Sequence, residues 1–160
     1  MKELKIESIF QVYNDLNELP SDISVLMNKA IIARTKAYAP YSKFKVGAAI
    51  LLDNGKIVTG NNQENVSYPS GLCAERTAIY YAGAEYPDSK ILKMAITAAS
   101  SNQITKNPIP PCGACRQTIA EYEVKQDSPI EIYFMGEVGS IMKSNSLGNL
   151  LPLLFDKTAL

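Results

Sequence analysis

Residues 46–60 read VGAAILL-DNG-KIVTG, and this stretch decides the fold. An apolar run at residues 46–52 is followed by a turn that contains Asn54 and Gly55, and then by a second short run that ends at Gly60. Two apolar runs joined by Asn-Gly are the strongest short-range signal of a β-hairpin. We therefore predict two antiparallel strands here.

The segment before the hairpin is predicted to be a helix. Ser21 or Asp22 can cap its N-terminus, and it should end before Pro40, because the residue preceding a proline disfavours the α-helical conformation. Apolar side chains recur through it at roughly helical spacing, at Ile23, Leu26, Ala30, Ile31 and Ala37. Residues 1–20 also carry some helical periodicity, and we interpret them as an appended arm that ends at Pro20.

After the hairpin, helical and strand-like segments alternate. The predicted order is a polar loop at 61–72, a helix at 73–84, a strand at 91–99, a proline-rich loop at 100–111, a helix at 112–122, strands at 130–135 and near 138–142, and a short helix around 147–154. Helices interleaved with strands indicate an α/β layered domain. A chain of 160 residues is long enough for one well-buried domain, which we place at residues 21–160.

Composition argues against several classes of partner. Lys and Arg together number 16, as do Asp and Glu, and the basic residues are scattered, whereas nucleic-acid binders usually show a basic excess or patch. No run of eighteen apolar residues is present, so no membrane-spanning helix is predicted. The first twenty residues are acidic and interrupted, unlike a signal peptide. We expect a cytoplasmic protein, and nothing in the composition favours a polyanionic partner.

All three cysteines fall in two short segments, Cys73-Ala74-Glu75-Arg76 and Pro111-Cys112-Gly113-Ala114-Cys115-Arg116. An odd number of cysteines cannot form a complete intrachain disulfide framework, so a metal site or redox chemistry is indicated. Thioredoxin-like redox motifs need no third cysteine, which favours the metal. Histidine is absent, and this excludes Ser-His-Asp and Cys-His nucleophilic systems.

The number of ligands favours a catalytic zinc over a structural one. Both cysteine segments begin predicted helices, where free N–H groups and the helix dipole stabilise thiolates. A structural zinc normally takes four Cys or His ligands, and this chain supplies three. Unless a carboxylate or a second chain fills the gap, the fourth position is open to water, whose pKa zinc lowers to about 7.

Two kinds of charged residue flank the cysteines. Glu75 lies two positions after Cys73 and is predicted to carry protons between water and substrate, although a glutamate at a helix start often only complements the helix dipole. Three thiolates leave the zinc centre with a net negative charge. Arg76 and Arg116 are placed to hydrogen-bond ligand sulfurs and offset that charge, and the alternative is that both are ordinary surface arginines.

With these segments in hand, residues 22–155 closely resemble the small, three-cysteine cytidine deaminases. The likeness includes Tyr41-Ser42-Lys43-Phe44-Lys45-Val46-Gly47-Ala48-Ala49 and Asn62-Gln63-Glu64-Asn65-Val66-Ser67-Tyr68. It implies a three-layer α/β/α domain with a mixed sheet, a zinc ion, and hydrolytic deamination of cytidine and deoxycytidine, with Glu75 as the proton shuttle.

The resemblance also implies how substrate is held. Asn62 and Glu64 would bind the ribose 3′-hydroxyl, the backbone N–H of Ala74 would contact the base carbonyl, and Phe44 would stack on the base. The relatives are homotetramers with shared active sites, to which Val66, Tyr68 and Phe155 would contribute from neighbouring subunits. Without the resemblance, the sequence favours a turn residue at Asn62 and a core residue at Phe44.

Three alternatives to cytidine deamination remain open. The nearest is an aminohydrolase acting on another aminopyrimidine nucleoside, such as blasticidin S. A polynucleotide deaminase is disfavoured by the balanced charge and the lack of a basic, aromatic surface. A non-catalytic, zinc-stabilised binding module is disfavoured by the missing fourth ligand.

Overall fold

A mixed six-stranded sheet forms the centre of the structure, a computed structural model that describes residues 1–157. The strand order is β1-β6-β5-β4-β2-β3; β4 and β5 run parallel, and the other neighbours run antiparallel. The strands are β1 (Gln11–Tyr13), β2 (Phe44–Leu52), β3 (Ile57–Asn61), β4 (Ile91–Ser100), β5 (Glu131–Met135) and β6 (Ile141–Ser144). The hairpin predicted from residues 46–60 is confirmed as β2 and β3.

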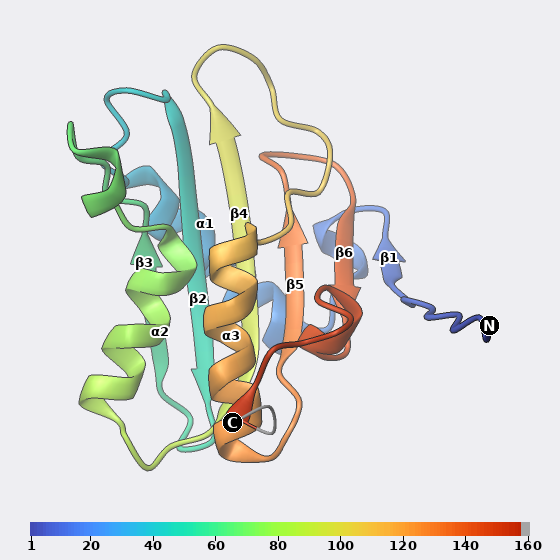
Figure 1. The fold of residues 1–160 in the computed structure, drawn as a ribbon. Coiled ribbons are helices and arrows are strands. Elements are labelled where there is room, and N and C mark those ends of the chain that lie inside the picture. Colours follow the sequence, from blue (N-terminus) through green and yellow to red (C-terminus); the bar gives the residue numbers. More distant parts are fainter. Residues whose placement is uncertain (158–160) are drawn as a thin grey trace.

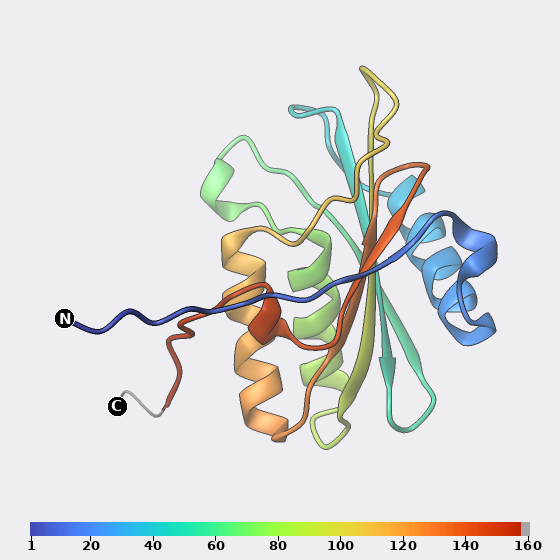
Figure 2. The same cartoon turned by 90° about the vertical axis from the view of Figure 1, so that its right-hand side faces the viewer.

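Helices cover both faces of this sheet. Helix α1 (Ser21–Thr35) lies on one face, and α2 (Ala74–Glu85) and α3 (Gly113–Gln126) lie side by side on the other (Figures 1 and 2). The predicted three-layer α/β/α architecture is therefore confirmed. The sheet separates two cores, one of which packs under the two helices that begin at the cysteines.

Side chains that alternate in direction along each strand contribute to both cores, one on each face of the sheet. Successive side chains of a strand point to opposite faces, so Ala48 and Ile50 of β2 pack toward α2 and α3, whereas Ala49 packs toward α1. Ile79 of α2 and Ile119 of α3 are fully buried in the first core. Each such side chain contributes about 1.5–3 kcal/mol by leaving water, so α2 and α3 are fixed to the sheet by burial.

Glycine allows α2 to approach the sheet closely. A Cβ on Gly60 of β3 would stand 2.5 Å from the carbonyl oxygen of Ala74 and 2.6 Å from the amide nitrogen of Ala78, both backbone atoms of α2. Real Cβ atoms do not approach backbone this closely. Gly60 therefore sets the distance between β3 and the first turn of α2, which follows Cys73.

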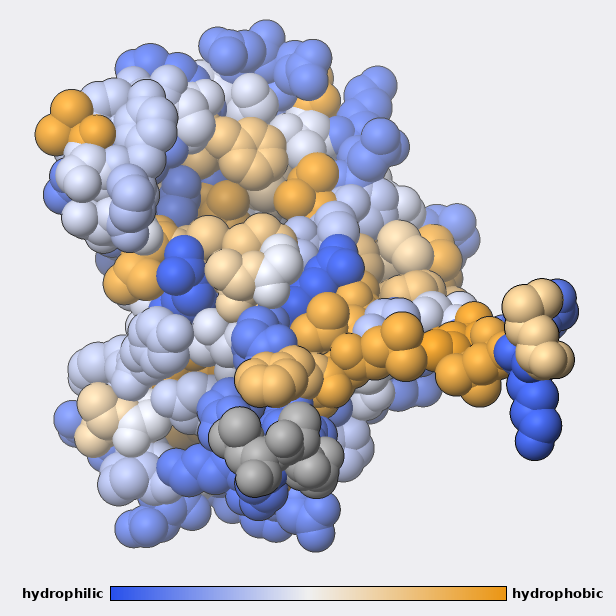
Figure 3. Space-filling view, viewed as in Figure 1, coloured by the Kyte–Doolittle hydropathy of each residue, from blue (hydrophilic) through white to orange (hydrophobic). Residues whose placement is uncertain are grey.

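The N-terminal segment differs from its helical periodicity. Residues 1–10 are extended and continue into β1, which pairs with β6 at the edge of the sheet. Apolar side chains on the arm are exposed, including Leu4 and Ile9, and Figure 3 shows hydrophobic colouring along it. A single turn of 3-10 helix, Leu16–Glu18, precedes α1. The helical periodicity of residues 1–20 thus forms no α-helix, and instead Phe10 packs against the core under α2 and α3 while Tyr13 of β1 packs against the core under α1.

Two other predicted elements change in extent. The strand expected near 138–142 is β6 at Ile141–Ser144, after a turn in which Gly139 takes a positive φ of 92°. The helix expected at 147–154 is wrong beyond its first residues, since only Leu147–Asn149 form a 3-10 turn. Among residues 1–157, no helix combines the length and apolar character needed to cross a membrane.

Candidate active site

The three cysteine sulfurs meet in one cluster. Cys73 Sγ lies 3.8 Å from Cys112 Sγ, and Cys112 Sγ lies 3.5 Å from Cys115 Sγ. All three sulfurs lie within 4.8 Å of one another, and none is in a disulfide. Sulfurs at about 2.3 Å from a tetrahedral zinc are separated by about 3.8 Å, so the spacing fits three ligands of one zinc ion.

Helix N-termini bring these sulfurs together. Cys73 is the N-cap residue of α2 and Cys112 the N-cap residue of α3, and neither side chain makes a capping hydrogen bond. The sulfurs are therefore free to face a shared ion beside two positive helix ends. Cys115 follows in the first turn of α3 and is fully buried.

Arg76 supplies the positive charge that the cluster needs. Its Nη2 donates to Cys73 Sγ at 3.7 Å. Hydrogen bonds from Cys115 and Arg76 lower the pKa of the Cys73 thiol to about 5. The pKa of the Cys115 thiol is raised by its hydrogen bond to Cys73, by burial and by the charge of Glu75. Without a metal, one of the three cysteines is favoured as a thiolate. A bound dication is needed to stabilise all three as thiolates.

Arg116 departs from the sequence-based expectation. Its Nε donates to the carbonyl oxygen of Pro111 at 2.8 Å, and its Nη1 donates to the carbonyl oxygen of Leu150 at 2.8 Å. The side chain therefore ties the start of α3 to the C-terminal segment instead of bonding a cysteine sulfur. Adjacent residues of a helix point about 100° apart, and this separates Arg116 from Cys115.

Glu75 is 4% exposed, in the first turn of α2 beside the sulfurs. Burial raises the pKa of its carboxyl to about 7, and the charge on Cys73 adds to the shift. A carboxyl with a pKa near 7 can accept and return a proton at neutral pH, and a bound dication would lower this value. A glutamate that only complements the helix dipole needs no burial, so the burial of Glu75 beside the sulfurs favours the predicted proton shuttle.

A cavity of about 590 Å³ opens onto this cluster. Its lining includes Cys73, Cys112 and Glu75 together with Phe44, Asn62 and Glu64. The cavity is large enough for a small ligand such as a nucleoside. A smaller cavity of about 230 Å³ near Tyr86 and Tyr122 contains none of the cysteines.

Asn62 and Glu64 are held by the start of β2 and the loop before it. Asn62 Oδ1 accepts from the Val46 amide at 2.8 Å, and its Nδ2 donates to the Phe44 carbonyl oxygen at 2.9 Å. Glu64 Oε2 accepts from the amides of Tyr41, at 2.9 Å, and Ser42, at 3.2 Å. Asn62 thus braces the start of β2, and Glu64 braces the loop before it, while both side chains line the cavity.

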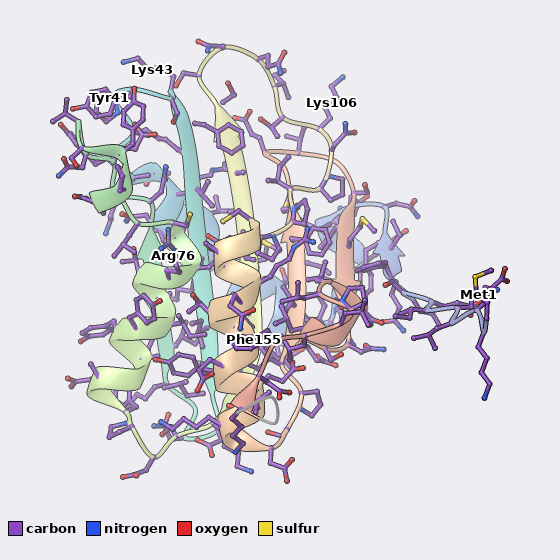
Figure 4. The ribbon with its side chains drawn as sticks, viewed as in Figure 1. Met1, Tyr41, Lys43, Arg76, Lys106 and Phe155 are labelled. Carbon is purple, nitrogen blue, oxygen red and sulfur yellow. The ribbon has the colours of Figure 1, made fainter. Side chains whose placement is uncertain are left out.

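The remaining predicted residues occupy different positions. Ala74 is completely buried at the start of α2. Tyr68 lines the cavity and is 75% exposed, with its ring centroid 6.0 Å from that of Tyr41. Phe155 is 63% exposed and does not line this cavity; its carbonyl oxygen accepts from Gln117, and Figure 4 shows its side chain in front of α3.

Sequence reasoning assigned no role to two cavity residues, Tyr41 and Ser42. Both contact Glu64, which lies more than twenty positions further along the chain. The only sequence signal for them is their presence in the motif at residues 41–49. Ile109 and Pro110, which precede Cys112, also line the cavity.

Comparison with known proteins places the chain in a family. The family described as "Cytidine and deoxycytidylate deaminase zinc-binding region" matches residues 20–127. The chain belongs to this family. Zinc is accordingly the metal that fits the three sulfurs, and the chain is a zinc-dependent hydrolase.

Similar proteins in this family match most of the chain. A cytidine deaminase from Halalkalibacterium halodurans is 40% identical over 134 residues, covering 84% of this chain and 94% of that protein. One from Sporosarcina psychrophila is 39% identical over 136 residues, covering 85% and 93%. The crystal structure of cytidine deaminase from Burkholderia pseudomallei, 39% identical, superposes with a TM-score of 0.70 and covers 82% of this chain and 97% of that chain.

Proposed function

We propose that this protein deaminates free cytidine and deoxycytidine by hydrolysis, giving uridine or deoxyuridine and ammonia. The observation that carries the proposal is a single cavity that joins three cysteine sulfurs and Glu75 to Phe44, Asn62 and Glu64. Metal-binding sulfurs, polar side chains and an aromatic ring in one cavity match the amine, sugar and base of a nucleoside.

Proton transfer is the task of Glu75. Zinc held by Cys73, Cys112 and Cys115 would supply Lewis acidity that activates a water for attack at C4 of the pyrimidine. Glu75 takes a proton from that water and delivers it to N3. It then takes the proton of the hydroxyl that has added to C4 and delivers it to the amino group, which leaves as ammonia while C4 becomes a carbonyl. Water and cytidine are consumed, so the atoms balance as uridine plus ammonia.

The other residues position the nucleoside. The backbone N–H of Ala74, at the start of α2, donates to the carbonyl oxygen of the base. Phe44 stacks on the ring, while Asn62 and Glu64 bind the 3′-hydroxyl of the sugar. An amide and a carboxylate offer both a donor and acceptors to a hydroxyl, which is the chemistry that a ribose requires.

A homotetramer with shared active sites extends the proposal. Val66 and Tyr68 are 77% and 75% exposed, and Tyr68 lines the cavity, so a neighbouring subunit could cover both side chains. Phe155 lies outside its own subunit's cavity, as a residue that serves a neighbour would. The enzyme would act in the cytoplasm, in pyrimidine salvage, on the nucleoside and not on a nucleic-acid polymer.

The proposal is tested by measuring bound zinc per chain while following the loss of cytidine absorbance. We expect one zinc per chain, rapid turnover of cytidine and deoxycytidine, and loss of activity when a chelator removes the metal. Blasticidin S, assayed side by side, is the competing substrate. Rapid turnover of blasticidin S with none of cytidine would overturn the choice of substrate, and bound zinc without any turnover would favour a binding module.

A further inference from the structure

The loop between α1 and β2 makes an unusual set of contacts with Glu64. Its carboxylate accepts from the backbone amides of Tyr41 and Ser42 and also from the Ser42 hydroxyl, which donates to Oε1. Every donor comes from two consecutive residues of one loop. The orientation of the Glu64 carboxylate is therefore determined by the conformation of that loop.

Ser42 connects this carboxylate to the neighbouring aromatic residue. While its hydroxyl donates to Glu64, its oxygen accepts from the backbone N–H of Phe44 at 3.0 Å. Lys43, between the two, takes a left-handed conformation with φ of 57°, which turns the chain so that residues 42 and 44 face each other. Figure 4 shows Tyr41 and Lys43 at the same end of the molecule.

The Phe44 backbone is thereby held from two sides. Its N–H bonds the Ser42 hydroxyl, and its carbonyl oxygen accepts from the Asn62 side chain. A chain of hydrogen bonds thus runs from Glu64 through Ser42 to the Phe44 backbone and on to Asn62. All four residues line the same cavity.

We propose that Ser42 is a positioning residue for the nucleoside, whose hydroxyl fixes the Glu64 carboxylate toward the sugar and links it to the Phe44 ring that holds the base. This inference rests on the proposed function, because it assigns Glu64 to the 3′-hydroxyl. A hydrogen bond to a charged group is roughly twice as strong as a neutral one, so the hydroxyl holds the carboxylate firmly. Ser42 does not itself take part in proton transfer.

The test compares a nucleoside that has the 3′-hydroxyl with one that lacks it. In Ser42→Ala we expect kcat/KM for cytidine to fall about tenfold, mainly through KM, while kcat/KM for 3′-deoxycytidine changes less than about twofold. Ser42→Thr, which keeps a hydroxyl, should restore most of the preference for cytidine. Ser70→Ala removes another loop hydroxyl, one that bonds only Ser67 among the described residues. This control should leave kcat/KM unchanged for both cytidine and 3′-deoxycytidine.

The possible results separate the alternatives. An equal loss for both nucleosides in Ser42→Ala would mean that the hydroxyl supports only the loop or Phe44, and no change for either would mean that it does not matter; both overturn the inference. If the zinc-loaded wild type deaminates neither nucleoside, the proposed function fails. Calorimetric binding of uridine and 3′-deoxyuridine then tests Ser42 alone: the inference requires wild type to prefer uridine and Ser42→Ala to lose that preference.

Discussion

Helices α2 and α3 begin in the same way but are held in different ways. Each has a cysteine at its N-cap, and neither cysteine forms a capping hydrogen bond. The first turn of α2 packs against β3 at Gly60, with no room for a Cβ. The first turn of α3 is tied instead to the C-terminal segment, through Arg116 to Leu150 and through Gln117 to Phe155.

This difference separates two tasks of the site. α2 carries the buried acid Glu75 and the arginine that bonds a sulfur, on a helix fixed to the sheet. α3 carries two of the three sulfurs and is joined to the segment after β6. Groups that move protons need closely fixed positions, and the sheet provides them for α2.

The largest effect is expected from the two glutamates, Glu75 on α2 and Glu123 on α3. Glu75→Gln should lower kcat by about 10²–10⁴-fold while zinc and fold are kept, because the amide cannot carry protons. Glu123 accepts from the amides of Ile130, at 2.8 Å, and Leu147, at 2.9 Å. Glu123→Gln should instead lower the free energy of unfolding by about 1–3 kcal/mol and leave turnover per folded molecule unchanged.

Steady-state kinetics, zinc analysis and denaturant unfolding of both variants check this pair. Full activity in Glu75→Gln would refute the proton-shuttle role. A loss of turnover in Glu123→Gln that is not matched by a loss of folded protein would show that the division between the two helices is wrong.

The two arginines give the next largest contrast. Arg76→Gln removes the donor to Cys73 Sγ and should weaken zinc affinity or activity by about 10–100-fold. Arg116→Gln removes donors to two carbonyl oxygens and should lower the free energy of unfolding by about 1–3 kcal/mol with little change in zinc affinity. A competitive chelator titration of each variant measures the affinity; equal losses in both would contradict the contrast.

Local patterns explain why much of this site was predictable from sequence. The cysteines and Glu75 lie in two short segments, and within each segment a helix start places the residues close together whatever the surrounding fold. Arg76 follows Cys73 by three positions, which puts both on one side of the helix, whereas Arg116 directly follows Cys115 and points elsewhere. The Asn-Gly turn likewise fixes the hairpin from neighbouring residues alone.

Contacts between distant segments were not predictable in this way. Ser42 and Glu64 meet because residue 38 pairs with residue 63 beside the sheet, and no local periodicity encodes that pairing. Residues 1–13 lie in an extended arm and a strand because the edge of β6 offers hydrogen bonds to β1, which outweighs a weak helical pattern. Residues 147–154 were expected to form a short helix because of their leucines. Their backbone instead bonds side chains of α3, at Leu147 to Glu123 and at Leu150 to Arg116.

A smaller effect is expected from two glycines, one for each helix start. Gly60→Ala should lower the free energy of unfolding by about 1–3 kcal/mol and displace α2, because its Cβ would meet backbone atoms at 2.5 and 2.6 Å. Gly113 is the first residue of α3, and apart from its chain neighbours and its own helix backbone no described atom lies within 4 Å of where its Cβ would stand. Gly113→Ala should therefore be neutral or stabilise by up to about 1 kcal/mol.

Denaturant unfolding of the two variants measures this contrast, and turnover at a temperature where both are folded extends it. Because Glu75 sits one turn or less from the displaced backbone, we expect Gly60→Ala to lose activity as well as stability. Equal stability of Gly60→Ala and Gly113→Ala would mean that α2 is no more tightly held by the sheet than α3.

The smallest effect should come from the direct bond between the two helices. Thr118 Oγ1 donates to the Ala114 carbonyl oxygen at 3.0 Å, so the Tyr80 hydroxyl, 3.3 Å away, is the donor to Thr118. Tyr80 is 47% exposed, and water can replace this bond. Tyr80→Phe should therefore lower the free energy of unfolding by no more than about 0.5 kcal/mol, and Tyr81→Phe, on the next exposed tyrosine of α2, is its control. A loss well above 1 kcal/mol in Tyr80→Phe alone would show that α2 and α3 align each other, whereas the small loss expected here means that the sheet and the shared zinc align them.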